Sequence, residues 1–208
     1  PGRLPRHFIF YPLQYTPESS INTPAPYFVD QLRVIDALRF AMPSDHVLVV
    51  KEHWSCLVVR PISFMRAVMR LPGVVVAKAH MPARALIERA GVTVSVTGTA
   101  TLEAFLAGRS ALTLGPGLAS WCLGGPTGLG DLATALRQRI GNPVPDTEVV
   151  ERVAQLFSAR YPFYLAPPHM AGEPMLRRGN MTRMLAAIVD HIRRDRAEVG
   201  EGVAAAVP

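Results

Sequence analysis

Short apolar runs alternate with helical patterns through residues 7–114, and this alternation limits the possible folds of the chain more than any other feature. The runs that predict buried strands are residues 7–11, 47–51, 74–77, 92–97 and 110–114. Helical spacing of apolar residues predicts the intervening helices, at residues 27–42, 62–71, 81–90 and 99–107. Such a series produces a mainly parallel sheet with helices on both faces. We therefore expect an α/β fold with a Rossmann-like parallel sheet.

The composition changes after the fifth predicted strand. Residues 115–130 are rich in Gly and Pro and predict a long loop. Three additional C-terminal helices are expected, at residues 129–140, 146–161 and 180–196. We expect residues 1–197 to form a single domain and residues 198–208 to form a flexible tail.

The overall composition is that of a folded, basic domain. Hydrophobic residues make up 49% of the 208 residues and charged residues 18%, which supports a buried core. No apolar run approaches the roughly 18–20 residues that cross a bilayer. The net charge of +6 favours anionic partners, namely sugar nucleotides, nucleic acid or a membrane surface. No nucleic acid is expected, because the chain has no helix-turn-helix pattern and no basic strand interleaved with aromatic residues.

The basic clusters and the cysteines provide indications of the cellular location of the protein. Arg177-Arg178 and the cluster at residues 193–196 are interpreted first as a solvated helix face and second as a peripheral contact with an anionic inner membrane. Two cysteines are too few for a disulfide framework, which predicts a reducing, cytoplasmic setting. The sequence begins at Pro1 without a signal-peptide pattern, and we expect it to be one lobe of a larger protein.

Thr97-Gly98-Thr99 follows a predicted strand and opens a helix. Exposed N–H groups and the positive end of the helix dipole make such a junction a candidate phosphate site. Thr97 and Thr99 would add hydroxyl donors, Gly98 would let the backbone approach an oxyanion, and Glu103 would face the crevice. The structural alternative is a Thr99 N-cap with Glu103 in a capping interaction.

Lys51, Glu52 and His53 follow the second predicted strand. His53 could donate to a phosphate or a sugar carboxylate, although a lone His is more often a structural hydrogen-bonding group. Lys51 adds positive charge beside it, or faces solvent. Glu52 is expected on the opposite side of the strand, exposed and without a role.

Gln14 and Glu18 belong to the loop after the first predicted strand, and could hydrogen-bond a sugar or position a nucleophile. The alternative for Glu18 is an ordinary polar turn. No metal site is expected, because no His, Asp and Glu set has ligand spacing. The chain also has no GxSxG, GxGxxG or Walker A pattern, so neither a hydrolase nor a dinucleotide or P-loop site is supported.

In this order, the three segments resemble the motifs of the capsule polysaccharide biosynthesis family of bacterial glycosyltransferases, which includes Kdo transferases that use CMP-activated sugar. The resemblance covers roughly residues 8–115, and the matching residues are Leu13, Tyr15, Pro17, Glu18, Lys51, Glu52, His53, Thr97, Gly98, Thr99, Glu103 and Ala104. Gln14, Thr16, Trp54 and Thr101 depart from the family pattern, in which His, Gln, Pro and Gly are usual at these places.

The resemblance implies the nucleotide-sugar lobe of a two-lobed GT-B enzyme, of the C-terminal-lobe type, with no cofactor. His53 and residues 97–99 would then bind the donor phosphate, Glu103 the ribose, and Glu18 would lie near the transferred sugar. The implied partners are a CMP- or UDP-linked sugar and a polysaccharide or glycolipid acceptor. Two alternatives stay open: a UDP-sugar 2-epimerase-like enzyme and a non-catalytic sugar-nucleotide-binding or assembly module.

Overall fold

The computed structural model describes residues 4–15, 19–158, 182–183 and 186. It divides the chain into two units, Pro1–Val153 and Ala154–Pro208, and the fold given below is that of the first unit. The predicted helix at residues 180–196 lies mostly outside the described residues, and the predicted tail at 198–208 lies wholly outside them. The prediction of one domain over residues 1–197 therefore stays a prediction.

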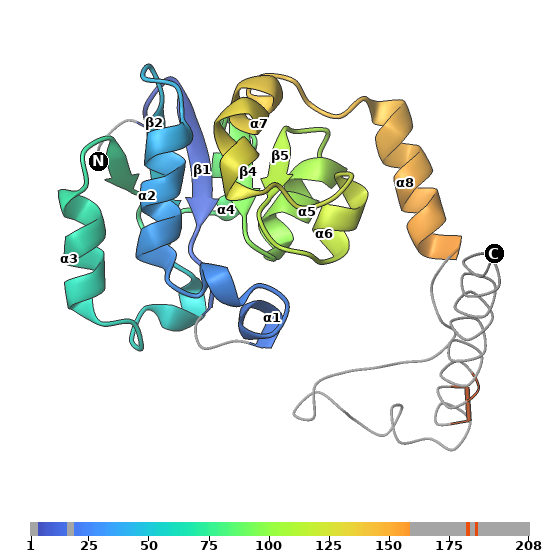
Figure 1. The fold of residues 1–208 in the computed structure, drawn as a ribbon, viewed down its shortest axis with the longest axis horizontal. Helices are drawn as coiled ribbons and strands as arrows, with labels where there is room; N and C mark the ends of the chain where they lie inside the picture. The colour runs from blue at the N-terminus through green and yellow to red at the C-terminus, as the bar shows by residue number, and fades with distance from the viewer. Residues whose placement is uncertain (1–3, 16–18, 159–181, 184–185, 187–208) are drawn as a thin grey trace, which may run out of the picture. The chain divides into compact units, whose positions relative to one another are not determined.

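The described part of the chain contains one parallel sheet of five strands (Figure 1). The strands are β1 (Phe8–Pro12), β2 (Val47–Lys51), β3 (Val74–Val76), β4 (Val92–Ser95) and β5 (Ala111–Thr113). Their order in the sheet is β3-β2-β1-β4-β5, and every neighbouring pair is parallel. The predicted Rossmann-like sheet is confirmed.

Helices cover both faces of this sheet, because side chains alternate between the faces along each strand. On one face, Ile9 and Tyr11 of β1 belong to a buried cluster that also includes Ile21 of the short helix α1 (Ser19–Asn22) and residues of three longer helices. These helices are α2 (Gln31–Ala41), α3 (Ile62–Arg70) and α7 (Leu132–Arg139). In Figure 1, α2 and α7 lie in front of the sheet.

The opposite face of the sheet has its own buried cluster. Phe8 and Phe10 of β1 pack there with residues of four helices, which are α4 (Ala83–Ile87), α5 (Thr99–Leu106), α6 (Leu118–Cys122) and α8 (Asp146–Ser158). The sheet is therefore the middle layer of three.

Several short elements correct the predicted pattern. The predicted loop at residues 115–130 contains α6 and a 3-10 turn, η3 (Leu129–Asp131). The Ser120 hydroxyl accepts from the N–H of Gly117 and donates to its carbonyl, both at 2.8 Å, which starts α6 despite the surrounding glycines. Short elements also occur at α1 (Ser19–Asn22), η1 (Pro26–Phe28) and η2 (Trp54–Cys56).

The predicted helix at residues 27–42 begins later than expected. Asp30 is the N-cap of α2, and its carboxylate accepts from the N–H groups of Leu32 at 3.1 Å and Arg33 at 3.4 Å. Asp satisfies N–H groups that the first turn of a helix leaves without partners. The residues before it form η1 instead of extending the helix.

Candidate functional site

A cavity of about 280 Å³ lies where the strand order of the sheet reverses. Chain order runs from β1 through β2 to β3 on one side of β1, and from β4 to β5 on the other. Ligands of open α/β sheets bind at such a point, outside the carboxyl ends of the strands. We call it the switch-point cavity, and the residues that line it are Pro12, Leu13, Gln14, Tyr15, His53, Thr97, Gly98, Thr99 and Ala100.

The structure brings together five of the residues predicted for the site. Gln14, His53, Thr97, Gly98 and Thr99 all line the switch-point cavity. They come from the segments after β1, β2 and β4, whose carboxyl ends meet at the same edge of the sheet. Two other predicted residues, Lys51 and Glu103, are outside the lining, and Glu18 lies outside the described residues.

The N-terminus of α5 opens toward this cavity. Gly98 is the N-cap, rather than Thr99 as in the structural alternative, and no side chain caps the helix. Thr101 is turned inward: its hydroxyl donates to the Gly98 carbonyl at 3.0 Å and lies 2.9 Å from the Ser95 hydroxyl. These contacts hold the β4–α5 turn in shape and leave the N–H groups of the first helical turn without a side-chain acceptor. The positive end of the α5 dipole therefore faces the cavity.

Thr97 contributes a buried hydroxyl to the same wall. Its Oγ1 atom is buried and makes no hydrogen bond with the described part of the protein. A hydroxyl removed from water without a partner costs about 1–3 kcal/mol. A ligand oxygen in the cavity would supply that missing partner.

Thr99 and Glu103 interact with each other on α5. The Thr99 hydroxyl donates to Glu103 Oε1 at 3.3 Å, and the Glu103 side chain is exposed. Glu103 therefore lies one turn beyond the cavity wall rather than within it. Its carboxylate can reach only the part of a ligand that extends along the outer side of α5.

His53, from the segment after β2, also lines the cavity. It is exposed and is the N-cap of η2, where its Nδ1 atom accepts from the N–H of Ser55 at 3.3 Å. In the neutral ring, Nε2 then carries the proton and is free to donate. The imidazole lies 5.7 Å from the Tyr15 ring, tilted by 54°, so one aromatic side chain supports the other.

Lys51 is half-buried at the end of β2. Its Nζ atom donates to the Glu52 carbonyl at 3.3 Å. Burial lowers the pKa of Lys51 from its usual value, and the negative charge of Glu52 partly opposes this effect. The ammonium group lies beside the cavity and contributes positive potential rather than direct contact.

Glu52 is buried and paired, and the expectation of an exposed side chain was wrong. Its Oε2 atom accepts from Arg60 Nε at 2.7 Å, and its Oε1 atom accepts from the N–H of His53 at 2.7 Å. Arg60 also donates from Nη2 to the Gln14 carbonyl at 2.7 Å. This ion pair joins the segments after β1 and β2, both of which line the cavity, and so fixes their separation.

A second link fixes the segment after β1. The Gln14 N–H donates to Gln31 Oε1 at 2.8 Å, and Gln31 Nε2 donates to the Gln14 carbonyl at 3.0 Å. Both side chains are buried. The Gln14 amide also lies against Gly98, where a Cβ atom would come within 2.8 Å of Gln14 Nε2. A glycine at position 98 therefore allows the two walls to meet closely.

Sequence reasoning missed Arg60 and Gln31, which support the site without lining it. Both lie in other segments of the chain, and neither forms part of a recognisable motif.

Within the described ranges, no group of three or more His, Cys, Asp or Glu side chains is placed to hold a metal ion. Among those same residues, no helix is both long enough and apolar enough to cross a membrane.

Comparison with known proteins gives similarities to solved structures alone. No protein-family model and no curated protein matches the chain. One similar structure is Thermosulfurimonas dismutans KpsC, beta Kdo 2,7 transferase, with a TM-score of 0.45 and 18% identity over 76% of this chain and 57% of that one. Another is Thermosulfurimonas dismutans KpsC, beta Kdo 2,4 transferase, with a TM-score of 0.45 and 15% identity over 73% of this chain and 53% of that one. The chain thus spans little more than half the length of these structures.

Proposed function

We propose that this chain is the donor lobe of a bacterial glycosyltransferase and binds a nucleotide-activated sugar, of the CMP-linked sugar-acid type, in the switch-point cavity. The observation that supports this most directly is the juxtaposition of the uncapped α5 N-terminus with the unpartnered Thr97 hydroxyl in one cavity. An anionic oxygen would satisfy both features, and both lie at the sheet edge where ligands bind in open α/β folds.

In this proposal, the donor phosphate lies at the start of α5. It accepts from backbone N–H groups of the first turn, from the Thr97 hydroxyl and from His53 Nε2. Lys51 adds positive potential, the Gln14 side chain contacts the sugar, and Glu103 contacts the ribose at the outer side of α5. Gly98 allows the Gln14 side chain to pack against the backbone of this wall, beside the proposed phosphate position.

These contacts would also favour transfer. The bond between the anomeric carbon and the phosphate oxygen breaks, and its electron pair remains on the departing phosphate. The oxygen of an acceptor hydroxyl, from a polysaccharide or glycolipid, forms the new bond to the anomeric carbon, and its proton passes to water. The α5 dipole and the Thr97 and His53 donors stabilise the growing phosphate charge, which is the electrostatic form of catalysis. Glu18 is proposed to act near the transferred sugar.

A pair of matched variants tests the proposed binding site. Thr97 and Thr93 both have buried hydroxyls without a hydrogen-bond partner among the described residues, but only Thr97 lines the cavity. We expect Thr97→Val and Thr93→Val each to raise the free energy of unfolding by ~1 kcal/mol, because each removes an unsatisfied hydroxyl. Only Thr97→Val should weaken nucleotide binding, by about 1.5–3 kcal/mol, the range for a hydrogen bond to a charged group.

The measurement is calorimetric titration of each protein with CMP, UDP and GDP, alongside urea unfolding. Saturable binding of one nucleotide, weakened in Thr97→Val and His53→Ala but not in Thr93→Val, supports the proposal and identifies the donor class. Equal binding by all four proteins would reject this site. Turnover of a UDP-sugar without any acceptor would instead support the epimerase-like alternative.

A further inference from the structure

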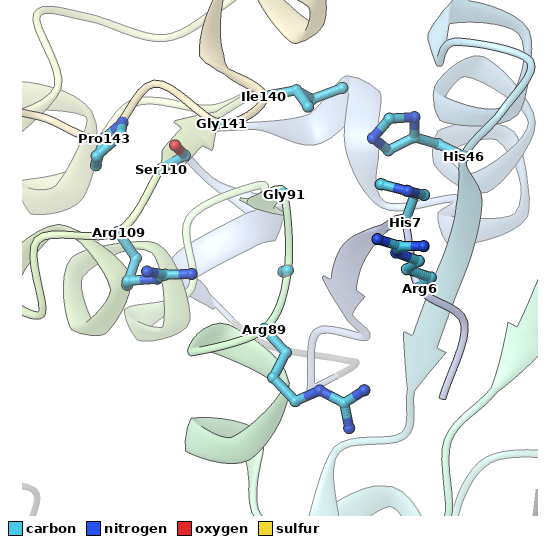
Figure 2. A pocket seen from close by; sticks show the side chains of 11 residues that line it. Arg6, His7, His46, Arg89, Gly91, Arg109, Ser110, Ile140, Gly141 and Pro143 are labelled. Carbon is cyan, nitrogen blue, oxygen red and sulfur yellow. The ribbon is translucent and has the colours of Figure 1, made fainter. Parts of the chain in front are cut away.

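A second cavity, of about 290 Å³, lies at the opposite edge of the sheet from the switch-point cavity (Figure 2). We call it the amino-edge cavity, because several of its lining residues directly precede strands. The polar side chains that line it are those of Arg6, His7, His46, Arg89, Arg109 and Ser110. His7 precedes β1, His46 precedes β2 and Ser110 precedes β5. No residue is shared between the two cavities.

The amino-edge cavity is strongly basic. Three arginines and two histidines line it, and none of the described residues of the lining is Asp or Glu. Figure 2 shows Arg109 extending toward the cavity from one side, with Arg6, His7 and His46 together on the other. Guanidinium groups gathered around one cavity without an interposed carboxylate create a positive potential that attracts anions.

The neighbouring carboxylates do not neutralise these arginines. Glu88 pairs with Arg84, at 2.8 Å, and Asp45 lies 2.8 Å from Nδ1 of His46 with its own side chain 70% exposed. Within the described residues, Arg6, Arg89 and Arg109 form no ion pair.

Backbone and ring contacts hold two of the cavity's basic groups in place. Arg109 Nη2 donates to the Glu88 carbonyl at 2.6 Å, which fixes one edge of its guanidinium and leaves other N–H groups available. The His46 ring lies 5.7 Å from the His7 ring, tilted by 55°. A set of donors fixed before a ligand arrives loses less conformational entropy on binding.

We propose that the amino-edge cavity binds a phosphate group, either free as a small phosphate or diphosphate or on the headgroup of an anionic lipid. Planar guanidinium groups match phosphate oxygens in pairs, and the Ser110 hydroxyl adds a neutral donor. This site is independent of the proposed donor site.

The test is calorimetric titration with inorganic pyrophosphate, carried out in the Thr97→Val background so that the switch-point cavity contributes little. We expect saturable binding that becomes at least about tenfold weaker in Arg109→Gln and in Arg6→Gln. The matched control is Arg66→Gln, an equal change in net charge at an exposed position on α3 outside the cavity. Arg6→Gln also guards against a folding defect in Arg109→Gln, because Arg6 is exposed.

Sedimentation with vesicles separates the two sources of phosphate. Binding to phosphatidylcholine vesicles that contain phosphatidic acid, lost in Arg6→Gln, would identify a lipid headgroup. Binding of pyrophosphate without binding to these vesicles would identify a free phosphate. Absence of both, or an equal loss in Arg66→Gln, would overturn the proposal.

Discussion

The buried pair of Glu52 and Arg60 is the residue-level feature on which the geometry of the switch-point cavity depends most. The side chain of Glu52 is 6% exposed and that of Arg60 9%, so neither charge is well solvated. Arg60 also lies over the Phe64 ring, with its Cζ atom 4.9 Å from the ring centroid. Each charge has only the other as a counter-ion among the described residues.

We expect Arg60→Met to lower the free energy of unfolding by about 3–5 kcal/mol, because it leaves the Glu52 carboxylate buried without a counter-ion. Glu52→Gln should also destabilise, since it leaves Arg60 unpaired. The double variant should be more stable than the sum of the two single changes predicts. Urea unfolding of all four proteins measures this, and strict additivity would contradict a direct coupling.

Lys51 makes the free energy of unfolding depend on pH. Its pKa is lowered from the usual 10.5 by burial, so folding disfavours the charged form. Below the lowered pKa, both folded and unfolded states are protonated and the full cost of burial applies. Between that pKa and 10.5, the unfolded state binds more protons, so stability rises with pH through this window.

We therefore expect Lys51→Met to be more stable than the parent protein at neutral pH, and this advantage to shrink as the pH approaches 10.5. The control is Lys78→Met, because Lys78 is exposed. Urea unfolding across this pH range measures both differences. A Lys51→Met advantage that does not change with pH would contradict the argument.

At the scale of elements, the turn between β4 and α5 shapes the cavity wall more than helix propensity does. Gly98 has φ −72° and ψ 155°, a conformation open to any residue. The glycine is required instead by the Gln14 side chain, which lies where a Cβ atom would be. A side chain at this position would push the wall formed by Gln14 outward.

We expect Gly98→Ala to change the free energy of unfolding by less than ~1 kcal/mol, because the end of the Gln14 side chain can shift. Nucleotide binding should weaken by about tenfold or more, as displaced donors lose a hydrogen bond to a charged group. Gly130→Ala is the matched control, since a Cβ atom there meets nothing within 4 Å. Calorimetric titration of both variants would show whether their affinities differ.

The sequence predicted the strands better than the details between them. β2 has the predicted bounds, because a buried parallel strand reads as a continuous apolar run. Glu52 was misplaced because strand alternation does not extend past Lys51, where β2 ends. Its partner Arg60 follows η2, and no local pattern shows that this segment folds back onto Gln14.

Short helices and helix starts were also difficult to predict from the sequence. α6 is five residues long and lies among glycines and prolines, so its composition indicates a loop. The hydrogen bonds between Ser120 and Gly117 that start this helix depend on a single serine. Similarly, Thr99 is a better N-cap residue than Gly98, yet the contacts of Thr101 and Ser95 with the Gly98 carbonyl set the start of α5 one residue earlier.

At the scale of the whole sheet, parallel strands separate two polar sites. All five strands point the same way, so every carboxyl end lies at the edge of the switch-point cavity and every amino end at the other edge. The five residues of β1 span about 17 Å between these edges. A ligand at one cavity therefore makes no contact with a ligand at the other.

The exchange of hydrogen bonds between Gln14 and Gln31 has a further consequence for this architecture. An amide side chain on α2 takes the place that a neighbouring strand would occupy, and so continues the ladder past the end of β1. The backbone N–H proton of Gln14 should then exchange with deuterated solvent as slowly as the backbone N–H protons of β1. Gln31→Met removes the Oε1 acceptor of this N–H, and should release the protection locally. Gln14, which lines the cavity, is thus held to α2 by two hydrogen bonds, and we expect it to be as rigid as the sheet itself.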